Sequence, residues 1–342
     1  MQEYNEAKRR NQVVKEFSKS LVSEKMQKRI CECGSWLQFI ADYDLKKRKL
    51  MAADFCKWRF CPMCAMRKAR KEAMRISTLM TYINAEFGKD FIFVTLSAPS
   101  VEGANLSDEI TRYAKAFNKI MVCEEVIKMQ HGFVRKLEIT HDAESKITKE
   151  MYKRKKEYYI RRGLRVGDAN PNYDMYHPHL HIVFAVNRGY FSGGRYIKQE
   201  RWLNLWRHVM GDDSITQVDV RKVKRVADSN DMSQDFDFQV LEFAKYAAKD
   251  TDYTRSGEIF DTFYHALKGR QVLTYGGLFA AANKKYKNDE LDEYIKADNT
   301  VYYWEIVYSW KGEKYNESKR KPLDAGDKLF LAMKGIDTEV LE

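Results

Sequence analysis

The chain has 342 residues, of which 44% are hydrophobic, so it can bury a sizeable core and does not have the composition of a disordered protein. Its 60 Lys and Arg residues exceed its 49 Asp and Glu residues, and the net charge of +11 favours an anionic partner, most often nucleic acid. No stretch reaches the ~18 apolar residues that cross a bilayer, and the first residues lack the apolar segment of a secretion signal. We therefore expect a cytoplasmic protein without a membrane partner, whose cysteines stay reduced.

The N-terminal region, residues 1–85, is basic and contains a cluster of cysteines. Four of them have the spacing C-x22-C-x4-C-x2-C: Cys33, Cys56, Cys61 and Cys64. The segment FCPMC resembles a zinc knuckle, in which a two-residue gap brings both sulfurs to one Zn²⁺. Four thiolates and no open position predict a structural zinc site, and scattered buried thiols are the alternative. The spacing leaves open whether Cys31 or Cys33 is the ligand.

A basic helix is expected directly after the cysteines, over residues 67–86. If the metal anchors this helix, its Lys and Arg residues suit contacts with DNA phosphates.

Residues 86–270 alternate between strand and helix patterns. Strands are expected at FIFVTLSAP (91–99), GFVRKLEIT (132–140), MYHPHLHIVFAV (175–186) and TQVDVRKV (216–223). Helices are expected at 107–130, 199–210 and 240–250. No helical pattern separates the second strand from the third, which favours antiparallel pairing of those two. The pattern predicts an α+β fold with a central antiparallel sheet and flanking helices.

Two further segments complete the division of the chain. The lysine- and arginine-rich residues 144–174 form a surface insertion between two strands, which is either a DNA contact or a solvated loop. The third region, 271–342, contains the sequence YYWEIVYSWKGEKY, which predicts a β-hairpin that turns near Lys311 and Gly312.

The third strand contains three histidines at alternate positions. Side chains alternate between the two faces of a strand, so the even-numbered apolar residues face the core while His179 and His181 share the opposite face. Imidazoles two residues apart can bind one ion. Glu138 on the neighbouring strand would add a carboxylate, and such a site suits Mg²⁺ or Mn²⁺ holding a phosphate. The alternatives are solvent-exposed histidines and a Glu138 that pairs with a basic residue. His177 precedes Pro178, and its role stays open.

The segment LEFAKYAAKDTDY contains a tyrosine that shares a helix face with two charged residues. Glu242, Tyr246 and Lys249 are spaced four and three residues apart. A tyrosine, with its usual pKa near 10, attacks a phosphate only if a metal or a lysine assists it. An ordinary amphipathic helix is the alternative.

The histidine pair and the later Tyr-x-x-Lys helix are together similar to the HUH superfamily of single-strand DNA endonucleases. The ordered set FVTLSAP, GFVRKLEIT, HPHLHIVFAV, EFAKYAAKDTDY, FCKWRFCPMC and VLTYGGLF more specifically resembles rolling-circle plasmid replication initiators of Gram-positive bacteria. This resemblance extends from about Cys33 to the tail of the chain.

The resemblance implies a role for each matching residue. His179 and His181 would bind a divalent metal, with Glu138 as third ligand. Tyr246 would be the nucleophile that leaves a 5′-phosphotyrosine and a free 3′-OH, and Lys249 would steady the phosphate or the metal. Glu242 would activate water for the terminating cleavage, in place of a second tyrosine. A scheme with two tyrosines would instead involve Tyr253.

The resemblance also implies partners. The substrate would be the plasmid origin, with its hairpin and single-stranded nick site. The protein partners would be a host helicase, single-strand binding protein and DNA polymerase. Two alternatives remain: a conjugative relaxase or single-strand transposase with the same chemistry, and a zinc-dependent DNA-binding regulator without catalysis.

Overall fold

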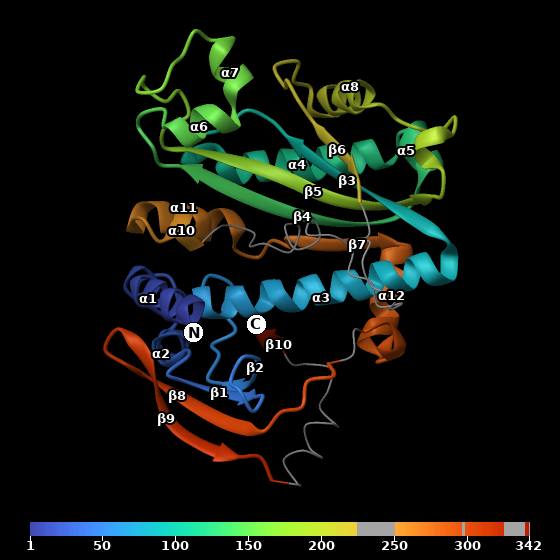
Figure 1. The fold of residues 1–342 in the computed structure, drawn as a ribbon. Coiled ribbons are helices and arrows are strands. Elements are labelled where there is room, and N and C mark those ends of the chain that lie inside the picture. Colours follow the sequence, from blue (N-terminus) through green and yellow to red (C-terminus); the bar gives the residue numbers. More distant parts are fainter. Residues whose placement is uncertain (224–249, 296–297, 325–338, 342) are drawn as a thin grey trace. The chain divides into compact units, whose positions relative to one another are not determined.

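The computed structural model describes the whole chain except residues 224–249, 296–297, 325–338 and 342. The described residues divide into two compact units. Unit 1 contains Met1–Lys89, Val223 and the described parts of Gly277–Glu342, and unit 2 contains Asp90–Lys222 and the described parts of Ala247–Gly276. In sequence, unit 2 is therefore inserted between the N-terminal and C-terminal parts of unit 1, as the colours of Figure 1 show.

Unit 1 is built on a five-stranded sheet with the order β10-β2-β1-β8-β9. Its strands are β1 (Trp36–Ala41), β2 (Arg48–Ala53), β8 (Trp304–Lys311), β9 (Lys314–Pro322) and β10 (Glu339–Leu341). Strand β1 pairs antiparallel with both β2 and β8, so Phe39 lies opposite Leu50 on one side and Ile306 on the other. The predicted hairpin is present, because β8 pairs with β9 across Gly312, which has a left-handed φ of 65°.

The sequence placed residues 1–85 and 271–342 in separate regions, but the pairing of β1 with β8 joins them in one sheet. The helices of this unit are α1 (Gln2–Phe17), α2 (Glu24–Glu32), α3 (Pro62–Phe87) and α12 (Leu278–Lys287), with a 3₁₀ turn, η3 (Asp292–Tyr294). Helix α3 begins with Pro62, where no backbone N–H is needed, and ends at Gly88 in the left-handed region. Tyr4 of α1 packs edge-on against Phe39 in the core beneath the sheet.

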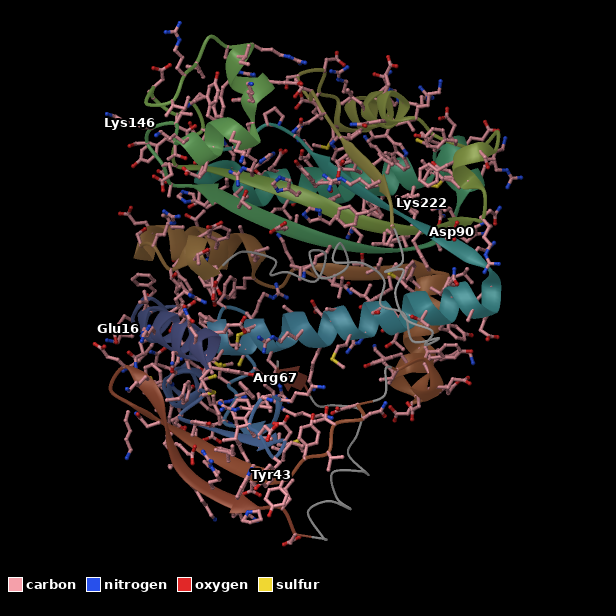
Figure 2. All side chains as sticks on the ribbon, in the orientation of Figure 1. Glu16, Tyr43, Arg67, Asp90, Lys146 and Lys222 are labelled. Atoms are coloured by element: carbon pink, nitrogen blue, oxygen red, sulfur yellow. The ribbon has the colours of Figure 1, made fainter. Side chains whose placement is uncertain are left out.

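Unit 2 is built on a second five-stranded sheet, with the order β6-β3-β5-β4-β7. Its strands are β3 (Lys89–Ser97), β4 (Gln130–Asp142), β5 (Met175–Asn187), β6 (Asp219–Lys222) and β7 (Leu273–Gly277). β4 and β5 pair antiparallel along their length, as the sequence predicted. β6 pairs antiparallel with β3, and Lys222 approaches Asp90 to 3.8 Å at that edge (Figure 2).

Helices pack on one face of this second sheet. They are α4 (Leu106–Met121), α5 (Glu124–Met129), α8 (Gln199–Met210), α10 (Asp250–Tyr253) and α11 (Gly257–Leu267), with 3₁₀ turns η1 (Gly103–Asn105) and η2 (Tyr190–Ser192). The apolar face of β5 is buried as expected, and the indole of Trp202 stacks on Phe184 with ring centres 5.9 Å apart. The predicted α+β fold with a central antiparallel sheet is confirmed.

One predicted helix differs from the structure. The pattern over residues 107–130 forms two helices, α4 and α5, because the chain leaves helical geometry at Val122 and takes an extended conformation at Cys123. Strand β4 then begins at Gln130. The helix expected at 240–250 falls almost entirely outside the described residues.

The insertion between β4 and β5 is a small folded segment. It contains helices α6 (Lys149–Arg154) and α7 (Lys156–Ile160), which lie beside the ends of β4 and β5 in Figure 1. Ile147, Met151 and Tyr159 form its own buried cluster. The sequence predicted a surface insertion here, and the structure adds an internal core that holds the basic helices in place.

Candidate functional site

The register of β4 and β5 brings three of the predicted site residues together. Glu138 lies directly opposite His179, and Lys136 lies opposite His181. A carboxylate oxygen of Glu138, Oε2, is 2.7 Å from Nε2 of His181. This arrangement requires only alternation along two paired strands, which is why the sequence pattern predicted it.

His181 is held on both of its ring nitrogens. Its Nδ1 lies 3.1 Å from the hydroxyl oxygen of Thr95 on β3, and its ring stacks on Phe93 with centres 5.6 Å apart. Glu138 contacts the other nitrogen. Because residues from both neighbouring strands, β3 and β4, contact this imidazole, its position on the sheet is fixed before any ligand binds.

Of Glu138, His179 and His181, it is His179 that has a buried ring nitrogen without a hydrogen-bond partner. Its Nδ1 is buried and has no hydrogen-bond partner, and its ring lies parallel to that of His181 with centres 5.9 Å apart. Burial, followed by the neighbouring His177 and His181, holds the pKa of His179 well below its usual value. The imidazole is thus neutral at pH 7, the form that binds metal ions.

The three residues fit a divalent cation by their chemistry, since they offer imidazole nitrogens and a carboxylate. Their donor atoms are not gathered as closely as those of the cysteines. Among the described residues, one group alone has three or more donor atoms that all lie within 4.8 Å of one another, and it is the four-cysteine cluster. The close Glu138–His181 contact is that of a hydrogen bond.

His177 lies next to His179, with ring centres 4.1 Å apart. Burial, followed by the positive charge of Lys155, lowers the pKa of His177 to about 4. Lys155 belongs to the insertion, and no pattern in the sequence connects it to the histidines.

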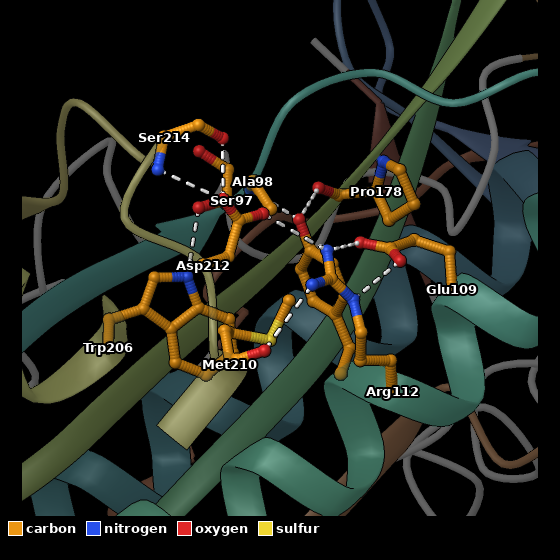
Figure 3. A network of polar contacts seen from close by, with 10 residues as sticks. Ser97, Ala98, Glu109, Arg112, Pro178, Trp206, Met210, Asp212 and Ser214 are labelled. Carbon is orange, nitrogen blue, oxygen red and sulfur yellow. Dashed lines mark hydrogen bonds and ion pairs between the residues drawn. The ribbon is translucent and has the colours of Figure 1, made fainter. Parts of the chain in front are cut away.

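A buried tyrosine fixes the backbone beside the histidines. The hydroxyl of Tyr113 on α4 donates to the carbonyl of Pro178, at 2.9 Å, and accepts the backbone N–H of Ala98, at 2.5 Å (Figure 3). Pro178 separates His177 from His179, and Ala98 follows strand β3. Tyr113 therefore ties the ends of two strands together. Burial raises the pKa of Tyr113 above its usual value, so its hydroxyl keeps the proton that it donates.

The same network connects helices α4 and α8 to β3. The indole N–H of Trp206 donates to the carbonyl of Ser97, at 2.9 Å. Arg112 makes two hydrogen bonds of 2.7 Å to Glu109 and approaches Asp212 to 3.5 Å (Figure 3).

Sequence reasoning missed Thr95 and Tyr113, although Thr95 lies two residues after Phe93 and so shares its strand face.

The three predicted residues of the tyrosine helix, Glu242, Tyr246 and Lys249, lie outside the described residues. The described residues begin again with α10. In this helix the carboxylate of Asp252 accepts a hydrogen bond from the backbone N–H of His141, at 3.2 Å. Asp252 therefore lies beside β4, and its partner His141 is three residues from Glu138 along that strand.

Tyr253 has the environment of a core residue. Its side chain is 2% exposed and packs edge-on against Phe260 and Phe263, with ring centres 5.9 and 6.1 Å away. A buried phenol of this kind has no access to a DNA phosphate, which argues against a scheme with two active tyrosines.

The four cysteines in unit 1 form a compact cluster. The sulfur of Cys33 is 3.4 Å from that of Cys61 and 3.6 Å from that of Cys64, and the sulfur of Cys56 is 3.6 Å from that of Cys64. Cys31 is exposed and outside the cluster, so the structure selects Cys33. Burial and the neighbouring thiols raise the pKa of Cys61, which means that several thiolates can coexist here only around a cation.

Backbone N–H groups point at the sulfurs of this cluster. The N–H of Cys56 donates to the sulfur of Cys33, that of Lys57 to Cys64 and that of Trp58 to Cys56, at 3.2 to 3.5 Å. Such contacts stabilise thiolates around a metal. The donor set and its spacing fit a tetrahedral, closed Zn²⁺ site.

The basic residues of α3 are engaged within unit 1. Arg67 stacks on Phe55, Arg75 stacks on Tyr286, and Arg70 pairs with Glu3. These three arginines thus already have side-chain partners within unit 1, and the predicted contact of the helix with DNA phosphates stays a prediction. No helix among the described residues has the length and apolarity to span a membrane.

Comparisons with known proteins identify the family of this chain. A family model described as Rep_1, replication protein, matches residues 47–318. A Protein rep of Staphylococcus aureus is 40% identical over 254 residues, which cover 74% of this chain and 95% of that protein. A Protein rep of Bacillus amyloliquefaciens is 33% identical over 276 residues, which cover 76% of this chain and 73% of that protein.

A Protein rep of Streptococcus pneumoniae is 28% identical over 297 residues, which cover 82% of each chain. No solved structure matches the chain. The family match covers most of the chain and includes the cysteine cluster from Cys56 on, both histidines, Glu138 and the segment with Tyr246. The chain thus belongs to the Rep family of replication proteins, which confirms its resemblance to plasmid replication initiators of Gram-positive bacteria.

Proposed function

We propose that the protein initiates rolling-circle replication of a plasmid by nicking one strand of the origin. The observation that supports this most is the register that brings Glu138 opposite His179 and within hydrogen-bond distance of His181. Membership of a replication-protein family supports the same substrate.

In the proposed nicking step, the phenol oxygen of Tyr246 attacks the scissile phosphorus. The new bond is a phosphotyrosine ester to the 5′ side of the nick, and the bond between phosphorus and the 3′ oxygen breaks. The proton lost by the phenol balances the proton gained by the leaving oxygen, so the products are the covalent adduct and a free 3′-OH. Lys249 would steady the phosphate in this step.

A divalent ion, Mn²⁺ or Mg²⁺, held by His179, His181 and Glu138, would polarise the phosphate when bound. The orphaned Nδ1 of His179 and the carboxylate of Glu138 support this donor set. The chain itself fixes His181 through Thr95 and Phe93. Asp252, six residues after Tyr246 in the sequence, contacts the backbone of β4 at His141.

Termination would use a second cleavage, in which Glu242 accepts a proton from the attacking water. Strand rejoining would follow. The free 3′-OH would be extended by a host DNA polymerase, with a helicase and single-strand binding protein as further partners in the bacterial cytoplasm. The four cysteines of unit 1 would bind a structural Zn²⁺.

The covalent adduct gives a direct test. We expect Tyr246→Phe to abolish the protein–DNA adduct on an origin oligonucleotide in the presence of Mn²⁺ and to keep DNA binding, since only the attacking oxygen is removed. Tyr253→Phe is the matched control, because Tyr253 is buried in the core of unit 2, and it should form the adduct. An adduct with the Tyr246 variant would show that another residue is the nucleophile.

The role of Glu242 needs its own variant. Glu242→Ala should nick and form the adduct but fail to release it by hydrolysis, so the adduct should accumulate on denaturing gels. Normal turnover in this variant would remove the proposed role. Loss of cleavage in EDTA, with recovery in Mn²⁺, separates a nuclease from a binding protein without catalysis.

A further inference from the structure

The insertion between β4 and β5 is the part of unit 2 with the highest density of positive charge. Residues 149–165 contain eight Lys or Arg residues and two Glu residues. The only ion pair that the described structure gives this stretch joins Arg161 and Glu157, at 3.6 Å on the exposed surface. Most of its charge is therefore not neutralised within the protein.

Three of these cations form an exposed group that we call the basic ridge, defined as Lys153, Arg154 and Lys156. None of the three has a carboxylate within ion-pair distance in the described part of the chain. Lys146, at the outer margin of the same insertion, is visible in Figure 2. Two aromatic features accompany the charge: Arg162 lies over the ring of Tyr158 at 3.9 Å, and Tyr173 is 53% exposed.

The insertion is rigid enough to present this surface. Its base is closed by backbone hydrogen bonds from Ile147 to Asp168 and from Gly167 to Ile147, at 2.9 and 2.8 Å. Asn170 adds a side-chain bond to the carbonyl of Glu144. Inside, Tyr159 is fully buried and stacks on Tyr152. The charges are thus attached to a folded scaffold and not to a solvated loop.

The position of the insertion relates it to the histidines. It leaves the sheet after Asp142 and returns at Met175, which are paired with each other. His177 is two residues beyond this junction and His179 is four, or about 13 Å along the strand. Lys155, between α6 and α7, is only half-buried, and its charge acts on both His177 and His179.

Lys155 also has no carboxylate within ion-pair distance among the described residues. The negative charge of Asp142 acts on Lys155 only from beyond ion-pair distance, and a partly desolvated ammonium group is costly unless an anion contacts it. An anion that reaches Lys155 from the basic ridge arrives beside the histidine strand. Single-stranded DNA has regularly spaced phosphate anions along its backbone, and its bases can stack on aromatic side chains.

We propose that the insertion is the single-strand DNA contact of this protein: the basic ridge binds the phosphates that flank the nick site, and Lys155 binds the phosphate nearest to the histidines. This proposal rests on the nicking function proposed above and adds the surface that holds the substrate. It distinguishes the insertion from α3, in which Arg67, Arg70 and Arg75 already contact side chains of unit 1.

The test measures binding of the full-length protein to fluorescein-labelled oligothymidylate, by fluorescence anisotropy at several salt concentrations. For a single strand, each phosphate contact contributes about 0.7 to the slope of log affinity against log salt. The variant K153Q/R154Q/K156Q should therefore lose about 2 from this slope and bind about tenfold more weakly at low salt. The control K115Q/K119Q/R188Q removes the same charge from exposed positions outside the insertion and should keep the slope.

Lys155 is tested by Lys155→Gln, which should lower the slope by about 0.7, and by Lys155→Arg, which should restore it. A structural role alone would not give this charge-dependent rescue. Equal slopes for the ridge variant and the wild type, or equal losses in the ridge and control variants, would overturn the proposal. Because binding needs no cleavage, this result is independent of whether Tyr246 forms the adduct.

Discussion

Removing the hydroxyl of Tyr113 should destabilise unit 2 without changing its apolar packing. In Tyr113→Phe the ring stays against Trp206, from which its centre is 5.5 Å away. The hydrogen bonds to Pro178 and Ala98 are lost, and both residues are buried. The carbonyl of Pro178 and the backbone N–H of Ala98 then lose the hydroxyl as a hydrogen-bond partner inside the protein.

Each unmet buried group costs about 1–3 kcal/mol, and some relaxation is expected, so the total loss should be about 2–4 kcal/mol. The measurement is urea unfolding of the full-length protein, followed by the fluorescence of its tryptophans, with the slope m compared between variants. A thermal scan should show a fall of about 5–15 °C in the transition of unit 2.

The matched control is Tyr196→Phe, because Tyr196 is 39% exposed and its hydroxyl has no hydrogen-bond partner among the described residues. Its stability should stay within about 0.5 kcal/mol of the wild type. If Tyr113→Phe also stays within that limit, the two backbone groups find other partners and Tyr113 does not hold β3 to β5.

Two further predictions concern the cysteine cluster and a glycine contact. Cys61→Ser should lower the zinc content of the purified protein from about one ion per chain, whereas Cys31→Ser should keep it, as measured by elemental analysis; equal zinc in both variants would exclude the four-cysteine site. Gly276→Ala would place a Cβ 2.2 Å from the ring of Phe133, which is held against Phe117, and should cost about 1–3 kcal/mol on urea unfolding. Gly194→Ala, with nothing within 4 Å of its Cβ, is the control; equal stability of the two variants would contradict the contact.

The part of the site that follows from strand alternation was predictable. The facing positions of His179 and Glu138 need only two neighbouring strands and a consistent register, and both are visible in the sequence. Thr95 was not predictable, because nothing local in the sequence indicates that β3 pairs with β5 and not with β4. Tyr113 reaches the strands from a helix, and its role depends on tertiary packing.

The cysteine cluster, too, could be predicted only in part from the sequence. The spacing identified three ligands, but it could not choose between Cys31 and Cys33, which differ by half a turn at the end of α2. The structure decides because Cys33 follows the last helical residue, Glu32, and Gly34 takes a left-handed φ of 66° that turns the chain towards β1. The pairing of β1 with β8 was beyond sequence reasoning, since about 270 residues separate the two strands.

The discontinuous course of unit 1 has a consequence for synthesis on the ribosome. All strands of the unit 2 sheet are complete once Gly277 has emerged, and that sheet can form while the C-terminal residues are still being made. Unit 1 must wait, because β1 lacks its neighbour β8 until the chain has passed Lys311. Tyr315 of β9 then closes over the cysteine cluster by donating its hydroxyl to the carbonyl of Gly34. A chain that stops before this hairpin would leave the centre of the N-terminal sheet as an open edge, so the cysteine-containing unit is completed only in a product that includes β8 and β9.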